Sequence, residues 1–490
     1  MRHYRAGRWL AAAAFAATCG TAQADWQFAP ELTVGGTYTD NVELASEGLE
    51  ENEFVTEIRP SFTLTREGPR FEADVAYQLQ HFMFSEDSDR NETFHNFSAT
   101  TRSELAPERF FLDLNGAYGQ ALIDPERAIP VSNLLVTQNL TDYWSVDANP
   151  YFQQDFGRAR LRLDYAYGMV RYPDFDISAG NNVDSFDREA RQVRLGSQPN
   201  EPGMTWLADY RQQIADYEDF NEFRYDIATL RLGVPLSRQF QLVGRYGFES
   251  DVQEDPRGGG MDIELWEVGF RWEASPRNEL EARIGDRFFG QSYFFSWTMQ
   301  GSRLQSNVSY NEAPTTFSLE QLNPNRVLVQ NGPNPVYDII ALSPDVYINK
   351  EATADLTWTL ARSEVLLRAR SVQREFITIP GEDREVGAGL GWYWRFGPRT
   401  QLNVSLYGAE VRFRETDVTD KLSQATLGIS RLIGQRTTVD LTFRHDQRRS
   451  NSVQQTNEYT ERAVMLMLTR SFGREGVAFG GRANLPGLRT

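Results

Sequence analysis

The stretch "RLRLDYAYGM" (160–169) decides the fold of this chain, because apolar or aromatic side chains occupy every second position. The positions between them carry arginine, aspartate or a small residue. Alternation with a period of two is the pattern of a β-strand that has one apolar and one polar face. A short connection, "FGR" (156–158), precedes the stretch, and the long acidic segment "YPDFDISAGNNVDSFDRE" (172–189) follows it. The sequence therefore predicts a strand between a short turn and a long loop.

The same unit recurs along the chain, for example in the alternating runs 239–248 and 438–444. Every other connection is tight and tends to combine arginine with glycine, serine or proline, as in "REGPR" (66–70), "APER" (106–109), "SPRN" (275–278), "GSR" (301–303), "ARSE" (361–364), "GPRT" (397–400) and "GQRT" (434–437). The connections between these are longer and acidic, as in "SEDSDRNE" (85–92), "ESDVQEDPRGGGMD" (249–262) and "RETDVTD" (414–420). Periplasmic turns that are short and extracellular loops that are long are typical of bacterial outer-membrane barrels.

We therefore predict an all-β fold, a transmembrane antiparallel up-and-down β-barrel of about 22 strands, within a range of 20 to 24. The first strand starts at Phe28 and the last spans Glu458–Phe472, so both ends lie in the periplasm. The least certain hairpin joins Glu279–Phe289 to Ser292–Gln300. Tryptophans near strand ends or on apolar faces are expected to form aromatic girdles at the membrane interfaces: Trp144, Trp206, Trp266, Trp272, Trp297, Trp358, Trp392 and Trp394.

Composition supports this class and excludes others. The mean hydropathy is −0.52 and no run of 18 apolar residues occurs, which excludes a helical membrane protein. The formal charge of −18 argues against a nucleic-acid partner. Aromatic residues make up 12% of a polar chain, as in outer-membrane barrels. The alternative, a soluble propeller or solenoid, would need a repeat of blade length or of fixed length, and only the two-strand period is found.

Residues 1–24 have the features of a signal peptide that is cleaved after Ala24. Arg2, Arg5 and Arg8 precede a short apolar run, and "AQA" (22–24) is a cleavage site of small residues. Residues 25–490 then form a single barrel, with a short periplasmic tail at 473–490. The one cysteine, Cys19, lies in the signal segment, so we expect neither disulfides nor thiolate chemistry in the mature chain.

The face of the strands that we expect to point inward carries charges of both signs. The basic residues are nearly all arginines, whose guanidinium groups bind carboxylates in a bidentate manner. Eight of them are predicted to line the lumen: Arg160, Arg162, Arg245, Arg271, Arg283, Arg368, Arg370 and Arg444. Two interpretations stay open. The arginines either brace the wall through pairs with inward carboxylates, or they form a polar track for an anionic polysaccharide.

A barrel of this size is wide, and known barrels with about 22 strands contain a plug. We expect no plug domain in this chain, because its first predicted strand begins almost at the predicted cleavage site. If the lumen is closed, long loops must close it. Two candidates are Gln120–Leu140, which contains the apolar "ALI" and "NLLV", and Phe317–Asp345.

Few residues of the sequence suggest catalysis or metal binding. The histidines of the mature chain, His81, His95 and His445, lie on three predicted strands, and no common catalytic or phosphate-binding motif occurs. We expect no enzymatic activity, no catalytic residues, no cofactor and no metal site. Carboxylate pairs in the long loops, such as Glu50-Glu51, more often form a solvated surface, although they could bind Ca²⁺ or cross-link lipopolysaccharide. The expected partners are outer-membrane lipid and lipopolysaccharide; the oligomeric state stays open.

The segment "TYTDNVELA" (37–45) ends the first strand abruptly, and Asp40-Asn41 is predicted to be a turn pair whose side chains cap their own backbone. The surrounding stretch from Trp26 to Leu44 resembles the start of the PEP-CTERM system-associated outer-membrane proteins. "EFVTEIRPSFTLTREGPR" (53–70) and "NVSYNEAPTTF" (307–317) resemble later strands of that family, although Asn311-Glu312 replaces an expected basic residue. The resemblance implies the Gram-negative outer membrane and a locus for exopolysaccharide and exosortase-sorted proteins, and it assigns no functional residue.

These observations favour a non-enzymatic barrel that serves exopolysaccharide export or surface assembly. A structural or adhesive surface barrel with a closed lumen, and a general diffusion porin, are the alternatives. The position of Phe317–Asp345 would distinguish them, because a gated conduit requires the segment to fold inward and a binding surface requires it to fold outward.

Overall fold

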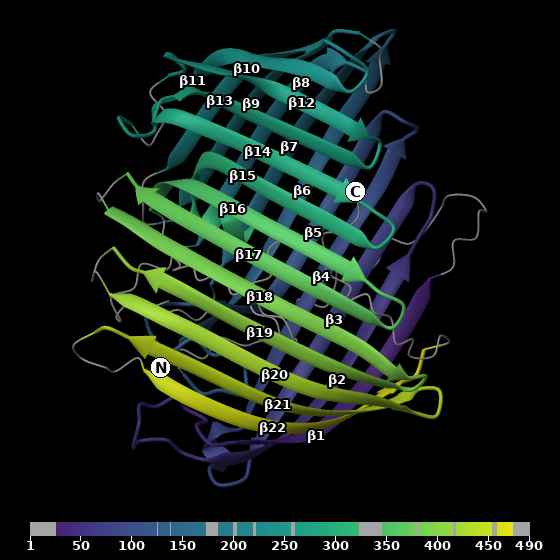
Figure 1. Cartoon of the computed structure of the whole chain (residues 1–490), viewed down its shortest axis with the longest axis vertical. Coiled ribbons are helices and arrows are strands. Elements are labelled where there is room, and N and C mark those ends of the chain that lie inside the picture. Colours follow the sequence, from purple (N-terminus) through teal and green to yellow (C-terminus); the bar gives the residue numbers. More distant parts are fainter. Residues whose placement is uncertain are drawn as a thin grey trace, which may run out of the picture.

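The structure, a computed structural model, is a single closed β-barrel (Figure 1). It describes residues 26–473 except Pro125, Gln138 and the ranges 173–184, 199–202, 219–221, 256–259, 323–344, 378–380, 415–417 and 453–457. The predicted signal peptide and nearly all of the predicted tail lie outside the described residues, so both stay predictions.

The described residues form 22 strands. Their bounds are β1 Gln27–Thr39, β2 Glu53–Arg66, β3 Phe71–Phe84, β4 Glu92–Ala106, β5 Phe110–Leu122, β6 Leu140–Phe156, β7 Ala159–Arg171, β8 Phe186–Ser197, β9 Thr205–Tyr217, β10 Phe223–Pro235, β11 Phe240–Glu249, β12 Ile263–Ser275, β13 Asn278–Arg287, β14 Gly290–Gln300, β15 Leu304–Thr316, β16 Val346–Thr359, β17 Ser363–Phe376, β18 Gly381–Gly397, β19 Thr400–Arg412, β20 Thr419–Ile433, β21 Thr437–Ser450 and β22 Tyr459–Ser471.

Each strand pairs antiparallel with the next, and β22 pairs with β1 to close the ring. The closing ladder runs from Glu31 opposite Ser471 to Thr39 opposite Ala463. Closure gives every strand a partner on both sides, which is the condition for a sheet to span a membrane. The predicted fold class and strand number are therefore confirmed, and the hairpin that was least certain from the sequence is present as β13 and β14.

The two faces of the wall differ as the alternation predicts. On β12, Trp266 and Val268 are 46% and 54% exposed, whereas Glu267 between them is 7% exposed. Large apolar side chains that are exposed on one face of a closed barrel meet lipid, and the polar face then lines the interior. The cross-strand register places all eight predicted girdle tryptophans on the lipid side. Six of them lie near the end with the short turns: Trp206, Trp272, Trp297, Trp358, Trp392 and Trp394.

The connections also follow the predicted alternation, with two corrections. All eight tight arginine turns that were identified in the sequence lie at one end of the barrel, the end at which β1 begins and β22 ends. The connection between β8 and β9 at this end is longer than a tight turn, at 198–204. At the long-loop end, β13 and β14 are joined by only Phe288 and Phe289. Gly290 permits this tight turn because its φ is +97°, a conformation that L side chains rarely adopt.

The long-loop end contains the two short helices, the 3₁₀ helix η1 (Ser88–Arg90) and α1 (Phe317–Gln321). Neither helix is long and apolar enough to cross a membrane. Arg90 in η1 links the first two long loops through ion pairs with Glu43 (2.8 Å), Glu51 (2.9 Å) and Asp87 (3.2 Å). Its hydrogen bond to Glu51 raises the pKa of the Arg90 guanidinium.

Asn41 ties the closing pair of strands together where β1 ends. Its amide donates to the carbonyls of Ala45 (2.8 Å) and Thr460 (3.1 Å), and its Oδ1 accepts from the Ala45 amide at 2.8 Å. The side chain caps its own loop as predicted, but it also bonds to β22, which the sequence did not indicate. In this loop, Leu44 adopts the left-handed region, with a φ of 53°.

Candidate functional site: a closed lumen with an arginine-lined cavity

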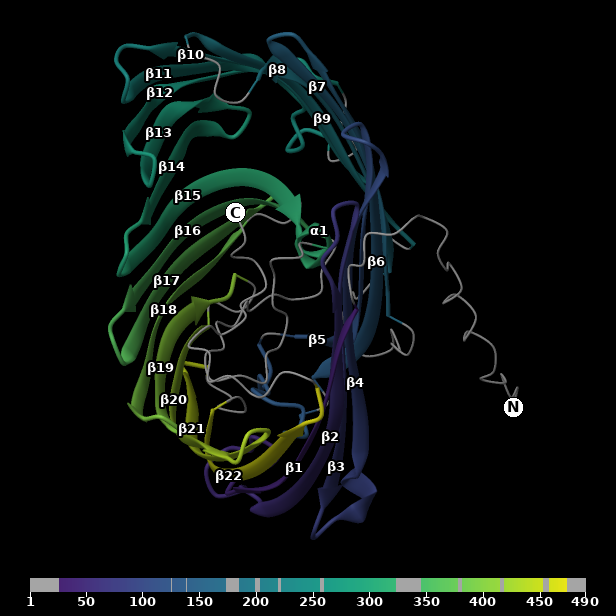
Figure 2. The same ribbon diagram turned by 90° about the vertical axis from the view of Figure 1, so that its right-hand side faces the viewer.

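The segment between β5 and β6, residues 123–139, folds into the lumen, and we call it the inner loop. It contacts interior-facing side chains of β3 and β5 on one part of the ring and of β19, β21 and β22 on another. Only a segment inside the ring can reach both sets of strands, and Figure 2 shows it within the barrel. The prediction that the Gln120–Leu140 region can occlude the lumen gains a structural basis, with Gln120–Leu122 belonging to β5.

Polar contacts hold the inner loop at both ends of its path. Asn139 fixes its base by donating to the carbonyls of Asp124 (2.8 Å) and Ala128 (2.9 Å). Across the lumen, the fully buried Arg448 of β21 donates to the backbone carbonyls of Glu126 (2.9 Å) and Arg127.

Further contacts attach the middle of the inner loop to the wall. The Asn133 amide donates to Gln80 (3.0 Å) and Gln120 (3.2 Å), and the Tyr459 hydroxyl donates to the carbonyl of Ile129 (3.2 Å). Because a buried polar group that loses its partner is costly, these contacts favour one position of the loop.

Apolar packing seals this part of the lumen. Leu134 and Leu135 of the inner loop are 3% and 2% exposed and pack in a cluster with Val42, Phe82 and Tyr459. The cluster lies at the long-loop end, where all of the contributing strands end or begin. A packed apolar cluster excludes water, so this end of the interior resembles a protein core rather than an open pore.

A second segment, at the end of β15, also enters the lumen. In Figure 2, β15 curves away from the wall and leads into α1 inside the ring. The side chains of Leu319 and Leu322 pack against a cluster on the opposite wall that includes Phe186 and Phe223. Thus Phe317–Leu322, the start of the predicted Phe317–Asp345 loop, folds inward; residues 323–344 lie outside the described residues.

Between the inward end of β15 and the wall lies a cavity of about 350 Å³, which we call the arginine cavity. Six arginines line it: Arg194, Arg211, Arg231, Arg245, Arg283 and Arg287. The acidic residues in its lining are Asp209 and Glu312. Asn311 and Pro314 of β15 form the opposite side. The lining is therefore predominantly cationic, and guanidinium groups that converge on a partly enclosed space are suited to carboxylate, sulfate or phosphate groups.

Most of these arginines also hold a carboxylate of the wall. Arg231 reaches Glu281 at 2.6 Å, and Arg287, which is 9% exposed, reaches Glu249 at 2.7 Å. The exposed Arg211 forms no ion pair with any residue that the structure describes. The cavity therefore combines fixed guanidinium groups with one that is free to bind an added anion.

The structure gives each of the eight arginines from the sequence prediction an acidic partner. The pairs are Arg160–Asp155 (2.6 Å), Arg162–Asp164 (2.7 Å), Arg245–Glu267 (3.2 Å), Arg271–Glu279 (2.9 Å), Arg283–Glu267 (2.9 Å), Arg368–Asp355 (2.6 Å), Arg370–Glu351 (2.8 Å) and Arg444–Asp446 (2.8 Å). The wall is thus braced by ion pairs. Only Arg245 and Arg283 of the eight also line the arginine cavity. Contact of any of them with a cargo stays a prediction.

Sequence reasoning missed several residues of this site. Arg448 and Asn133 were not singled out, because their partners are far away in the chain. The apolar "NLLV" inside an otherwise polar connection was the one signal that pointed to a packed loop. The histidines lie on β3, β4 and β21, and His81 and His95 bond to Thr93 (2.8 Å) and Tyr77 (2.9 Å). Within the described ranges, no group of three or more His, Cys, Asp or Glu side chains could hold a metal ion.

The closed, even-stranded ring, its lipid-facing apolar wall and its short-turn and long-loop ends together define an outer-membrane β-barrel. No family model and no curated protein matches the chain. Among solved structures, it is similar to the siderophore receptor PirA from Acinetobacter baumannii, with 7% identity, a TM-score of 0.49, and coverage of 92% of this chain and 81% of the receptor.

Two further solved structures are similar with lower TM-scores. OccAB3 from Acinetobacter baumannii has 9% identity and a TM-score of 0.36, with coverage of 91% of this chain and 99% of OccAB3. OccK2 (OpdF) from Pseudomonas aeruginosa has 10% identity and a TM-score of 0.37, with coverage of 91% and 98%. Likeness of this degree concerns only the barrel shape and carries no statement about ligands.

Proposed function

We propose that the protein is a gated, non-enzymatic outer-membrane conduit for an acidic polysaccharide, acting in exopolysaccharide export or surface assembly. The observation that carries the proposal is the inner loop, which crosses the lumen at the long-loop end and is held there by Arg448 and Asn133. A loop held by a few polar contacts and one apolar cluster can move as a unit, unlike the strands of the wall. The arginine cavity, which lies elsewhere in the lumen between β15 and the wall, supplies cationic groups suited to a chain that carries carboxylates.

The resemblance to the PEP-CTERM system-associated proteins supports the choice of an exopolysaccharide as cargo. A general diffusion porin is the weaker alternative, because the inner loop and the apolar cluster around Leu134 and Leu135 oppose free passage. A structural barrel with a permanently closed lumen is the other candidate. The complete ion pairing of the eight wall arginines favours it, since these residues then need no cargo to satisfy them.

Planar-bilayer recording tests the conduit. We expect the intact barrel to conduct little, and a variant with residues 126–137 replaced by a short Gly-Ser linker to form large, stable channels. Polygalacturonate added to the open variant should block the current, whereas neutral dextran of the same size should not. Arg211→Gln should weaken the block, while Arg449→Gln, an equal loss of charge at an exposed residue, should leave it unchanged. Equal block by the two polymers would contradict an acidic cargo, and a loop-deleted barrel that stays closed would favour the structural alternative.

A further inference from the structure

The wall has one weak seam, between β14 and β15. Their ladder contains six residue pairs, from Phe295 opposite Tyr310 to Gln300 opposite Gln305, and every other ladder in the ring contains at least nine. On either side of the seam, the neighbouring ladders continue to Arg287 opposite Gly290 and to Thr316 opposite Val346. The part of the seam toward the long-loop end is therefore not closed by backbone pairing.

The ladder stops because β15 separates from β14, although it stays paired with β16 up to Thr316. Beyond Tyr310 the strand curves into the lumen (Figure 2), where Thr316 accepts a hydrogen bond from the Tyr217 hydroxyl of β9 at 2.8 Å. Arg287 of β13 donates to the carbonyl of Glu312 at 3.0 Å. These contacts hold the strand on the interior surface of β9–β13, away from the adjacent edge of β14.

In this unpaired part of the seam, a hydrogen bond to a side chain takes the place of the backbone ladder. The Glu312 carboxylate accepts from the backbone amide of Tyr293 on β14 (3.1 Å) and from the Tyr310 hydroxyl (2.5 Å). Glu312 is only 5% exposed. Of the two contacts, the one with Tyr293 crosses the seam, and rotation of the Glu312 side chain would break it. Opening any other ladder requires the loss of a long row of backbone hydrogen bonds.

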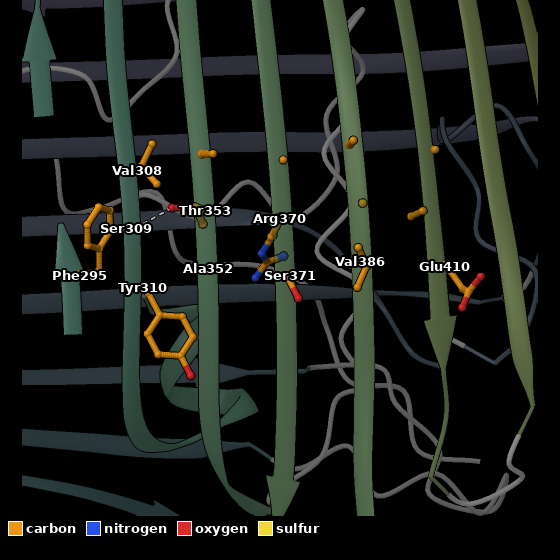
Figure 3. Close-up of a pocket in the computed structure, with 16 residues that line it drawn as sticks. Phe295, Val308, Ser309, Tyr310, Ala352, Thr353, Arg370, Ser371, Val386 and Glu410 are labelled. Carbon is orange, nitrogen blue, oxygen red and sulfur yellow. Dashed lines mark hydrogen bonds between the residues drawn. The ribbon is translucent and has the colours of Figure 1, made fainter. Parts of the chain in front are cut away.

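A groove of about 650 Å³ lies beside the seam on the lipid side. Its floor consists of small residues on β16–β19, including Ala352, Ala354, Ala388 and Gly408, and Phe295 and Val386 stand at its sides (Figure 3). These residues share the outward face with Trp358, Leu367 and Leu406, which are exposed on the lipid side. An apolar groove of this volume on the lipid side is suited to an acyl chain.

The seam joins this groove to the arginine cavity. Tyr310 lines the groove, and its hydrogen-bond partner Glu312 lines the cavity. Asp286 and Gln291 face outward and are exposed. They pair with each other two residues beyond Tyr293, toward the long-loop end, and mark the edge of the apolar exterior at that end. The opening therefore lies at head-group depth, with cationic groups inside the wall and an apolar groove outside it.

We propose that this arrangement is a lateral binding site for an anionic lipid with a phosphate-bearing head group. The head enters the arginine cavity through the β14–β15 seam when Glu312 moves aside, and an acyl chain lies in the groove. Guanidinium groups bind phosphate in a bidentate manner, and Arg211 has no competing ion pair within the described residues. The site goes beyond the proposed conduit for polysaccharide, since it gives the lumen a side entrance from the membrane.

Native mass spectrometry of the delipidated full-length barrel tests the site with two probes that share their acyl chains. Palmitoyl-oleoyl phosphatidic acid should be retained at least about tenfold more tightly than the corresponding phosphatidylcholine. Arg211→Gln should remove most of this preference. Ala388→Phe, which fills the groove, should lower the retention of phosphatidic acid, whereas the matched Ala425→Phe on the lipid face of β20 should not. Equal retention of the two lipids, or equal effects of the two alanine variants, would overturn the proposal.

The lateral route needs its own test. Ser292→Cys with Asn311→Cys, joined by a short bifunctional thiol reagent, should prevent the seam from opening and abolish uptake of phosphatidic acid from vesicles. The control pair Ser296→Cys with Ser309→Cys lies opposite each other in the intact ladder, so its linkage should change nothing. Uptake that persists in the linked seam would rule out the lateral route. Because no current is measured, failure here is distinct from failure of the polysaccharide conduit.

Discussion

Removal of the Arg448 contact should open the lumen without unfolding the barrel. The guanidinium donates to the carbonyls of Glu126 and Arg127 in the inner loop and pairs with Asp420 on β20. Substitution by glutamine alone would leave the buried Asp420 without its cation. The informative variant is therefore Arg448→Gln with Asp420→Asn, which removes both charges and keeps the side-chain volumes similar.

The size of the effect follows from the contacts that are lost. Each hydrogen bond from a charged donor contributes roughly 1.5–3 kcal/mol, so the two bonds to the inner loop give at least about 3 kcal/mol. The bonds from Asn133 and Tyr459 to the loop region remain. A change of about 3 kcal/mol shifts the equilibrium between the closed and open positions of the loop by roughly 100-fold.

Single-channel recording in planar bilayers measures this shift as the fraction of time that the channel is open. The variant should show frequent openings where the unaltered protein shows few. Arg449→Gln is the control, because this neighbour is exposed and bears the same charge. An intact barrel, judged by its heat-modifiable migration in detergent gels, whose open fraction is unchanged would refute the view that the inner loop is the gate.

Three further predictions concern the barrel itself. Epitope tags inserted at Asp87 or Asp255 should be labelled on intact cells and a tag at Gly434 should not, because the first two sites lie at the long-loop end; labelling at Gly434 would reverse the orientation. Leu163→Arg should impair assembly much more than Asp164→Asn, since a charge on the lipid face costs about 2–4 kcal/mol at mid-bilayer, whereas Asp164 faces the lumen beside Arg162 and Arg194; similar folded yields would show that the faces are assigned wrongly. Asn41→Ala should lower the unfolding temperature of the barrel, since about 1–3 kcal/mol is lost with its bonds to Ala45 and Thr460, and no change in thermal melts would mean that this tie does not stabilise the closing strands.

The sequence alone determined the class of fold, the number of strands to within a few, and the end at which each connection lies. These features depend on a period of two and on loop length, which are local properties of the chain. The run 160–169 therefore predicts its own strand, β7, and the side of the wall that each of its residues faces. The same locality explains why the arginines could be assigned to the inner face before their partners were known.

Tertiary structure alone decided how the lumen is closed and where the wall is weak. Arg448 meets the inner loop, and Thr316 meets Tyr217, across a ring whose curvature no local pattern encodes. The apolar alternation of β15 stops at Tyr310, which is also where the strand separates from β14 while it stays paired with β16 to Thr316. An alternation of apolar and polar residues determines which face of its own strand a side chain occupies. The path of the strand depends instead on packing against segments that are distant in the sequence. For that reason the arginine cavity, the groove and the seam between them became visible only in the folded barrel.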